Sequence, residues 1–119
     1  GMHRLGFPPE AATVAAGRLR GCASVTGELH YMTHLACADQ RDDAMTAAQI
    51  RGFSELLAGV PGERTIANSA GLLSWPDSHA DWVRPGIMLY GASPFAGETG
   101  EGLGLRLMPV PVSETAITT

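Results

Sequence analysis

Residues Asp81–Gly91 read Asp-Trp-Val-Arg-Pro-Gly-Ile-Met-Leu-Tyr-Gly, and this stretch decides the fold prediction. A short apolar run ends at Arg84. Pro85 and Gly86 then break the strand, and a second apolar segment starts at Ile87. The backbone N–H groups of Gly86 and Ile87 are expected to be free at a helix start, where an anion is favoured. The stretch therefore predicts a strand that ends in one arginine beside a site for an anionic cofactor.

The chain before this stretch alternates between predicted strands and helices. A helix is expected from Thr46 to about Ala58, because Thr46 and Gln49 form a capping box and the apolar residues that follow recur at helical spacing. Strands are expected on either side of it and at the start of the opening stretch, at Leu29–Leu35, Arg64–Ala67 and Trp82–Arg84. This alternation predicts an α/β fold with a parallel sheet.

The bulk composition excludes several classes of protein. The chain has 119 residues, 45% of them hydrophobic and 17% charged, which suits one modest globular domain. A net charge of −4 with singly scattered basic residues argues against nucleic-acid binding, and no apolar run is long enough for a membrane span. Cys22 and Cys37 are expected to be reduced thiols in a cytoplasmic protein. All eight basic residues are arginines, so this chain offers no lysine for a Schiff base.

Polar side chains stand at the expected ends of four strands. The carboxyl ends of the strands build the active site of a (β/α)₈ barrel, so four such ends in a row favour that architecture. The residues are Arg4, Thr33-His34, Asn68-Ser69 and Arg84.

Each of these residues also has a simpler interpretation. Arg4 could be an ordinary surface residue, and His34 alone is more often a satisfied core histidine. Asn68 and Ser69 could be turn residues. A metal site is conceivable but disfavoured, because the histidines, Cys37 and nearby acids match no recognised ligand pattern.

Taken together, the polar groups favour one composite site. Ser69 offers a hydroxyl and Gly86 and Ile87 offer amides, all of which suit a phosphate. Arg84 and Arg4 add charge-assisted hydrogen bonds. The set predicts a phosphorylated cofactor at the top of a barrel.

Four motifs resemble those of bacterial alanine racemases, in the same order and with similar spacing. They are Gly1–Gly6, Thr33–Asp39, Ala67–Gly71 and Asp81–Gly91. The resemblance implies an enzyme that uses pyridoxal 5′-phosphate, with an N-terminal (β/α)₈ barrel, a C-terminal β domain and a homodimeric assembly. It also implies interconversion of L-alanine and D-alanine for peptidoglycan synthesis through a pyridoxal-phosphate aldimine.

The resemblance also implies roles for individual residues near the cofactor ring. Arg84 would face the pyridine nitrogen and keep it largely unprotonated, and His34 would hydrogen-bond Arg84 from behind. Arg4 would reach the phenolic oxygen of the cofactor and the carboxylate of the substrate.

A second group of residues would surround the phosphate. Ser69 would bind it together with the amides of Gly86 and Ile87, and Asn68 would lie beside this set in a supporting role.

The two bases of such enzymes match no residue here. The resemblance implies a Schiff-base lysine on the first barrel strand and a tyrosine from the partner subunit, and Tyr31 and Tyr90 match neither position. We therefore expect residues 1–104 to form the second half of a (β/α)₈ (TIM) barrel and residues 105–119 to form a crossover strand into a C-terminal β domain. The isolated chain is expected to be inactive. Two alternatives stay open: a non-catalytic barrel that binds pyridoxal phosphate, and a racemase of broader amino-acid specificity.

Overall fold

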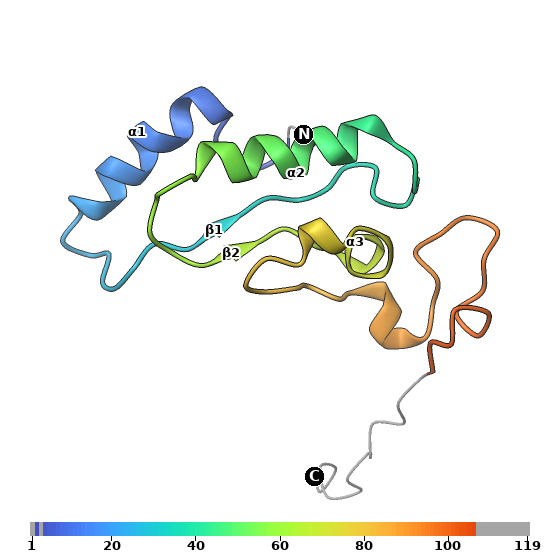
Figure 1. Ribbon diagram of the computed structural model, residues 1–119. Helices are drawn as coiled ribbons and strands as arrows, with labels where there is room; N and C mark the ends of the chain where they lie inside the picture. The colour runs from blue at the N-terminus through green and yellow to red at the C-terminus, as the bar shows by residue number, and fades with distance from the viewer. Residues whose placement is uncertain (1, 3, 107–119) are drawn as a thin grey trace, which may run out of the picture.

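The computed structural model describes residue 2 and residues 4–106 as a chain of alternating helices and short strands (Figure 1). Short 3-10 helices follow the last α-helix. In chain order the elements are α1 (Pro9–Arg20), β1 (Tyr31–Met32), α2 (Ala44–Leu56), β2 (Arg64–Thr65), α3 (Ser69–Ser74), η1 (Pro76–Ser78) and η2 (Ile87–Tyr90).

The sheet is parallel, as the alternation of elements predicts. In the register of β1 and β2, Tyr31 lies opposite Arg64. A third extended segment joins by a parallel bridge between Thr65 and Trp82. The segment then continues alongside the residues after β2, because the backbone N–H of Arg84 donates to the carbonyl of Ala67 at 2.9 Å.

The strands are shorter than the sequence predicts. Beyond β1, the carbonyl oxygen of Thr33 accepts from Nη2 of Arg84 at 2.7 Å. Beyond β2, the carbonyl of Ile66 accepts from the same nitrogen at 3.3 Å. These carbonyls bond to a side chain instead of extending the ladder, so regular pairing ends where the arginine enters.

Helix α2 begins earlier than predicted. Its N-cap is Asp43, whose carboxylate accepts from the backbone N–H of Met45 at 2.7 Å and of Thr46 at 3.1 Å. The capping box expected at Thr46 and Gln49 is therefore wrong, because a carboxylate one turn earlier satisfies the free N–H groups. Gln49 instead accepts from the N–H of Ala36 at 3.0 Å and donates to the carbonyl of His34 at 3.3 Å. In this way α2 fixes the loop that follows β1.

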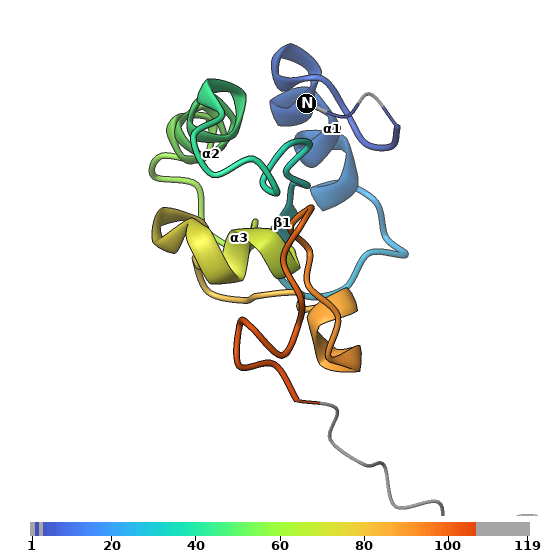
Figure 2. The ribbon, with the colours of Figure 1, turned by 90° about the vertical axis from the view of Figure 1, so that its right-hand side faces the viewer.

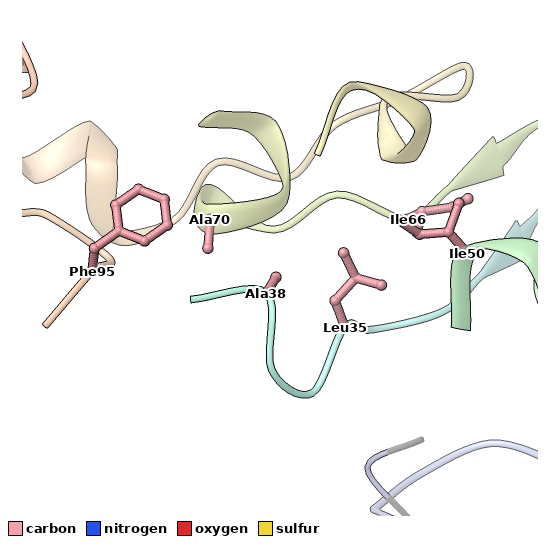
Figure 3. Close-up of a cluster of buried hydrophobic side chains, with 6 residues drawn as sticks. All are labelled: Leu35, Ala38, Ile50, Ile66, Ala70 and Phe95. Carbon is pink, nitrogen blue, oxygen red and sulfur yellow. The ribbon is translucent and has the colours of Figure 1, made fainter. Parts of the chain in front are cut away.

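The hydrophobic core joins α2 and α3 to the loop after β1 and to the segment that carries Phe95 (Figure 3). In the close-up, Leu35 and Ala38 come from the loop and lie opposite Ile66 and Ala70, with Phe95 beside Ala70. Burial of such side chains contributes roughly 1.5–3 kcal/mol each for the larger ones. The members are Leu35, Ala38, Ile50, Ile66, Ala70 and Phe95.

Two predictions concern other parts of the chain. Among the described residues, none of the helices has the length and apolar character needed to cross a membrane. The crossover strand predicted for residues 105–119 lies, from residue 107 onward, outside the described residues.

Replacing Gly62 with alanine is expected to destabilise the protein by about 1–3 kcal/mol. Gly62 has a φ of +124°, and a Cβ there would collide with the carbonyl oxygen of Leu29, at the point where the chain passes close to the start of β1. The matched control is Gly17→Ala in α1, where an added Cβ meets nothing within 4 Å. That change should stabilise by roughly 0.5–1 kcal/mol. Urea unfolding of both variants tests this, and equal midpoints would contradict it.

Candidate cofactor site

The candidate site lies where the parallel segments end. Figure 2 views the molecule from the end at which the parallel segments stop, with α3 and the loop after β1 toward the viewer. A hollow of ≈ 350 Å³ opens there between the loop, α3, the Arg84 segment and the start of η2. Its lining consists of His34, Leu35, Ala36, Asp39, Asn68, Ser69, Ala70, Arg84, Gly86, Ile87 and Pro94. The fold therefore brings six of the seven predicted site residues to one hollow, and Arg4 is the exception.

Arg84 ties three chain segments together at the edge of the hollow. Its Nη1 donates to Oγ1 of Thr65 at 2.6 Å, and its Nη2 donates to the carbonyls of Thr33 and Ile66. Burial lowers the pKa of Arg84, but a guanidinium stays protonated at any ordinary pH. The site therefore contains one fixed positive charge whose orientation is set by the ends of β1 and β2.

His34 does not hold Arg84 in the way that the sequence predicts. Among the hydrogen bonds of the described residues, none joins the His34 imidazole to Arg84, which donates instead to Thr65 and two backbone carbonyls. The pKa of His34 is lowered by its burial and then by the positive charges of Arg84 and Arg4. At neutral pH the imidazole of His34 is therefore uncharged, and it lies near the guanidinium of Arg84.

Thr65 is the site residue that sequence reasoning missed. Its hydroxyl is the side-chain acceptor for Arg84, and it lies opposite Trp82 in the parallel register. Thr65 lies opposite the residue two positions before Arg84, so its hydroxyl could have been predicted as a partner of Arg84 once the register of the strands was known.

Ser69 lies at the centre of a group of backbone N–H donors, which we call the Ser69 cradle. Its side chain is buried, with 5% of the residue exposed, and its Oγ accepts from the backbone N–H of Gly86 at 2.8 Å and of Met88 at 3.4 Å. Since both contacts use the oxygen as acceptor, its hydroxyl hydrogen is left to donate. The N–H of Gly86 is thus taken by Ser69 and is not free as predicted. The N–H of Ile87 has no acceptor among the described residues.

Asn68 lines the hollow, whereas Arg4 lies outside its lining. Asn68 is the N-cap of α3: its Oδ1 accepts from the N–H of Gly71 at 2.9 Å, and its Nδ2 donates to the carbonyl of Leu35 at 3.3 Å. Its amide therefore holds the wall of the hollow, and a direct contact with a cofactor stays a prediction. Arg4 is exposed, and its charge reaches His34.

A second hollow, of ≈ 400 Å³, lies at the other end of the sheet. Arg64 and the carboxylates Asp77 and Asp81 line it. The guanidinium of Arg64 donates to the carbonyl of Leu57 at 2.6 Å. The two carboxylates outnumber this one guanidinium, so the charge of the lining is net negative. An anion is therefore disfavoured there and favoured at the Ser69 end.

Acid is expected to destabilise the protein through His34. Because folding lowers its pKa below 6.5, the unfolded state binds more protons than the folded state just below that pH. The stability is complete above about pH 6.5 and is lost as the pH falls toward the folded pKa. Asp39 also lines the hollow, so the comparison needs His34→Gln, which removes only this titration. Urea midpoints should fall less steeply with acid in the variant, and identical slopes would exclude His34 as the cause.

Fold and site together define a parallel β/α protein with a hollow at the carboxyl ends of its strands. Within that class, the chain belongs to the alanine racemase N-terminal domain family, whose model matches residues 1–94. The fold of this family is the TIM barrel.

Individual relatives agree with this assignment. The chain is 53% identical over 105 residues to an alanine racemase from Shewanella baltica and 59% identical over 106 residues to one from Halorhodospira halophila. These matches include 88% and 89% of this chain. The chain spans only 29% of the length of each relative.

Solved structures give the same result. The crystal structure of biosynthetic alanine racemase from Pseudomonas aeruginosa matches with a TM-score of 0.81 and 46% identity, over 89% of this chain and 29% of that one. The crystal structure of alanine racemase from Bartonella henselae with covalently bound pyridoxal phosphate matches with a TM-score of 0.67 and 26% identity, over 86% of this chain and 28% of that one.

Proposed function

We propose that this chain forms the cofactor-holding part of an alanine racemase that uses pyridoxal 5′-phosphate to interconvert L-alanine and D-alanine. The observation that carries the proposal is that the buried hydroxyl of Ser69 and the fixed guanidinium of Arg84 line the same hollow. The names of the relatives support the reaction, and the Bartonella henselae structure supports the cofactor.

The donors around the hollow fit a phosphorylated pyridine. Ser69 Oγ–H and the N–H of Ile87 suit phosphate oxygens, because both are donors without an acceptor among the described residues. Arg84 has five N–H donors, and its three hydrogen bonds leave those on Nε and one on Nη1 for a ring nitrogen. A volume of ≈ 350 Å³ lies within the usual range for small-molecule sites.

The residues of this chain would hold and tune the cofactor. Pyridoxal phosphate supplies an electron sink that stabilises negative charge on the α-carbon of an amino acid. Arg84 would donate a hydrogen bond to the ring nitrogen and, as a permanent cation, disfavour a proton there. Arg4, whose charge reaches His34, would bind the carboxylate of the substrate. Ser69 and Ile87 would fix the phosphate, and His34 would stay neutral next to Arg84.

We propose that the residues that transfer protons during racemisation lie outside this chain. The chain has no lysine, so it contains no Schiff-base residue, and the chain alone is proposed to be inactive. Residues 1–104 would be the second half of the barrel and residues 105–119 the crossover into a C-terminal β domain. The complete protein would be a cytoplasmic homodimer that supplies D-alanine for peptidoglycan.

Conversion of L-alanine to D-alanine tests the proposal. The complete gene product that contains this chain, loaded with pyridoxal phosphate, should racemise alanine, and the 119-residue chain alone should not exceed the rate of free cofactor. Cofactor binding without turnover would instead favour a non-catalytic binding protein. Faster turnover of other amino acids would favour a racemase of broader specificity. Failure to bind the cofactor would overturn the proposal.

A further inference from the structure

Arg41 makes an unusually complete set of contacts for an exposed side chain. Its Nη1 and Nη2 donate to the two carboxylate oxygens of Glu98, the second at 3.0 Å. Its Nε donates to Oγ of Ser74 at 3.2 Å. Its guanidinium lies over the ring of Phe95, 4.0 Å from the centroid. We call Arg41, Ser74, Phe95 and Glu98 the Arg41 clamp.

The clamp joins three of the segments that line the cofactor hollow. Arg41 follows Ala36 and Asp39 in the loop after β1, and Ser74 is the last residue of α3. Phe95 and Glu98 follow Pro94, which lines the hollow. The clamp residues thus lie just beyond the lining residues on the same three segments. The side chain of Arg41 therefore links segments that are far apart in sequence at the rim of the hollow.

An isolated exposed ion pair contributes little, but this arrangement has three features that strengthen it. The arginine–carboxylate contact is bidentate, and the guanidinium also stacks on an aromatic face. The ring belongs to Phe95, which is buried in the core and therefore fixed. The hydrogen bond with Glu98 raises the pKa of Arg41, and it lowers the pKa of Glu98, so both partners stay charged at neutral pH.

The bidentate and stacked contacts need an arginine. A lysine keeps the charge but has neither the planar fork nor the flat face. Nothing else among the described contacts holds Glu98 to the loop after β1 by a side-chain hydrogen bond. The position of Glu98 relative to that loop therefore depends on Arg41, while Phe95 is held separately by the core.

We propose that Arg41 is a positioning residue: the Arg41 clamp holds the Pro94 segment as the outer wall of the hollow and so sets how tightly the phosphorylated cofactor is retained. The proposal rests on the proposed function for its ligand. The mechanical part, that the clamp orders the segment, stands on the contacts alone.

Two measurements on the complete gene product test the two parts separately. Hydrogen exchange of the peptide spanning residues 92–99 reports on the segment, and equilibrium titration with pyridoxal phosphate reports on retention. Arg41→Ala should speed exchange in that peptide and weaken cofactor binding roughly fivefold, the size of a strong surface ion-pair effect. Arg51→Ala, at an exposed arginine on α2 outside the clamp, is the matched control and should change neither.

Rescue distinguishes a positioning role from general loss of structure. The double variant Arg41→Glu, Glu98→Arg should recover part of the exchange protection and of the affinity, whereas Arg41→Lys should recover less than a bidentate pair does. If Arg41→Ala matches Arg51→Ala in both measurements, the inference is overturned. If the unaltered protein binds no pyridoxal phosphate, the proposed function and the retention part fail together, and the exchange results still decide whether the clamp orders the segment.

Discussion

Replacing Arg84 with alanine is expected to weaken pyridoxal phosphate binding at least about 100-fold and to destabilise the protein by about 3 kcal/mol. The guanidinium donates to Thr65 and to the carbonyls of Thr33 and Ile66, so its removal breaks hydrogen bonds to the ends of both β1 and β2. It also removes the fixed positive charge from the hollow. Urea unfolding measures the loss of stability, and titration with the cofactor measures the loss of affinity.

Arg84→Lys tests whether the positive charge alone is enough or whether the planar guanidinium is also needed. An ammonium restores the positive charge but cannot donate to three acceptors in the plane of a guanidinium. We expect stability and affinity between those of the alanine variant and the unaltered protein, with an altered absorption spectrum of the bound cofactor. If Arg84→Ala binds pyridoxal phosphate as tightly as the unaltered protein, Arg84 does not contribute to the site.

Ser69→Ala is expected to weaken cofactor binding by roughly 30- to 100-fold, the equivalent of about 2–3 kcal/mol. The change removes the hydroxyl donor, and it also leaves the N–H groups of Gly86 and Met88 without their acceptor beside a buried position. Pyridoxal without the phosphate should bind both proteins about equally, because the lost contacts face the phosphate.

Ser54→Ala is the matched control for this prediction. Ser54 Oγ donates to the carbonyl of Ile50 within α2 and does not line the cofactor hollow. The control should keep the cofactor affinity of the unaltered protein. Equal losses in the two serine variants would mean that the effect comes from general destabilisation and not from the cradle.

Local sequence patterns were enough to predict the order of structural elements along the stretch that contains Arg84. The Asp81–Gly91 stretch contains a strand end, a break and a helix start in one run, and the structure shows the arginine, the interruption and η2 in that order. The parallel order of β1 and β2 is also confirmed. The order within Asp81–Gly91 could be predicted because it depends on residues that are neighbours in the chain. The parallel pairing could be predicted from the alternation of strands and helices.

The remaining features depend on contacts between distant residues. The Arg41 clamp joins residues 57 positions apart, and Arg84 meets Thr33 across 51 positions, so no local pattern reveals either contact. The early ends of the strands have the same cause, since the ladder stops where the Arg84 side chain takes the carbonyls. The competition between Asp43 and Thr46 for the cap of α2 is local, and there the stronger acceptor decided the outcome.

A crystal structure of the complete gene product with pyridoxal phosphate tests the central claim most directly. We expect the phosphate to lie within hydrogen-bond distance of Ser69 Oγ and the N–H of Ile87, with the ring nitrogen facing Arg84. Pyridoxal phosphate bound away from these three residues, for example in the hollow beside Arg64, would contradict it.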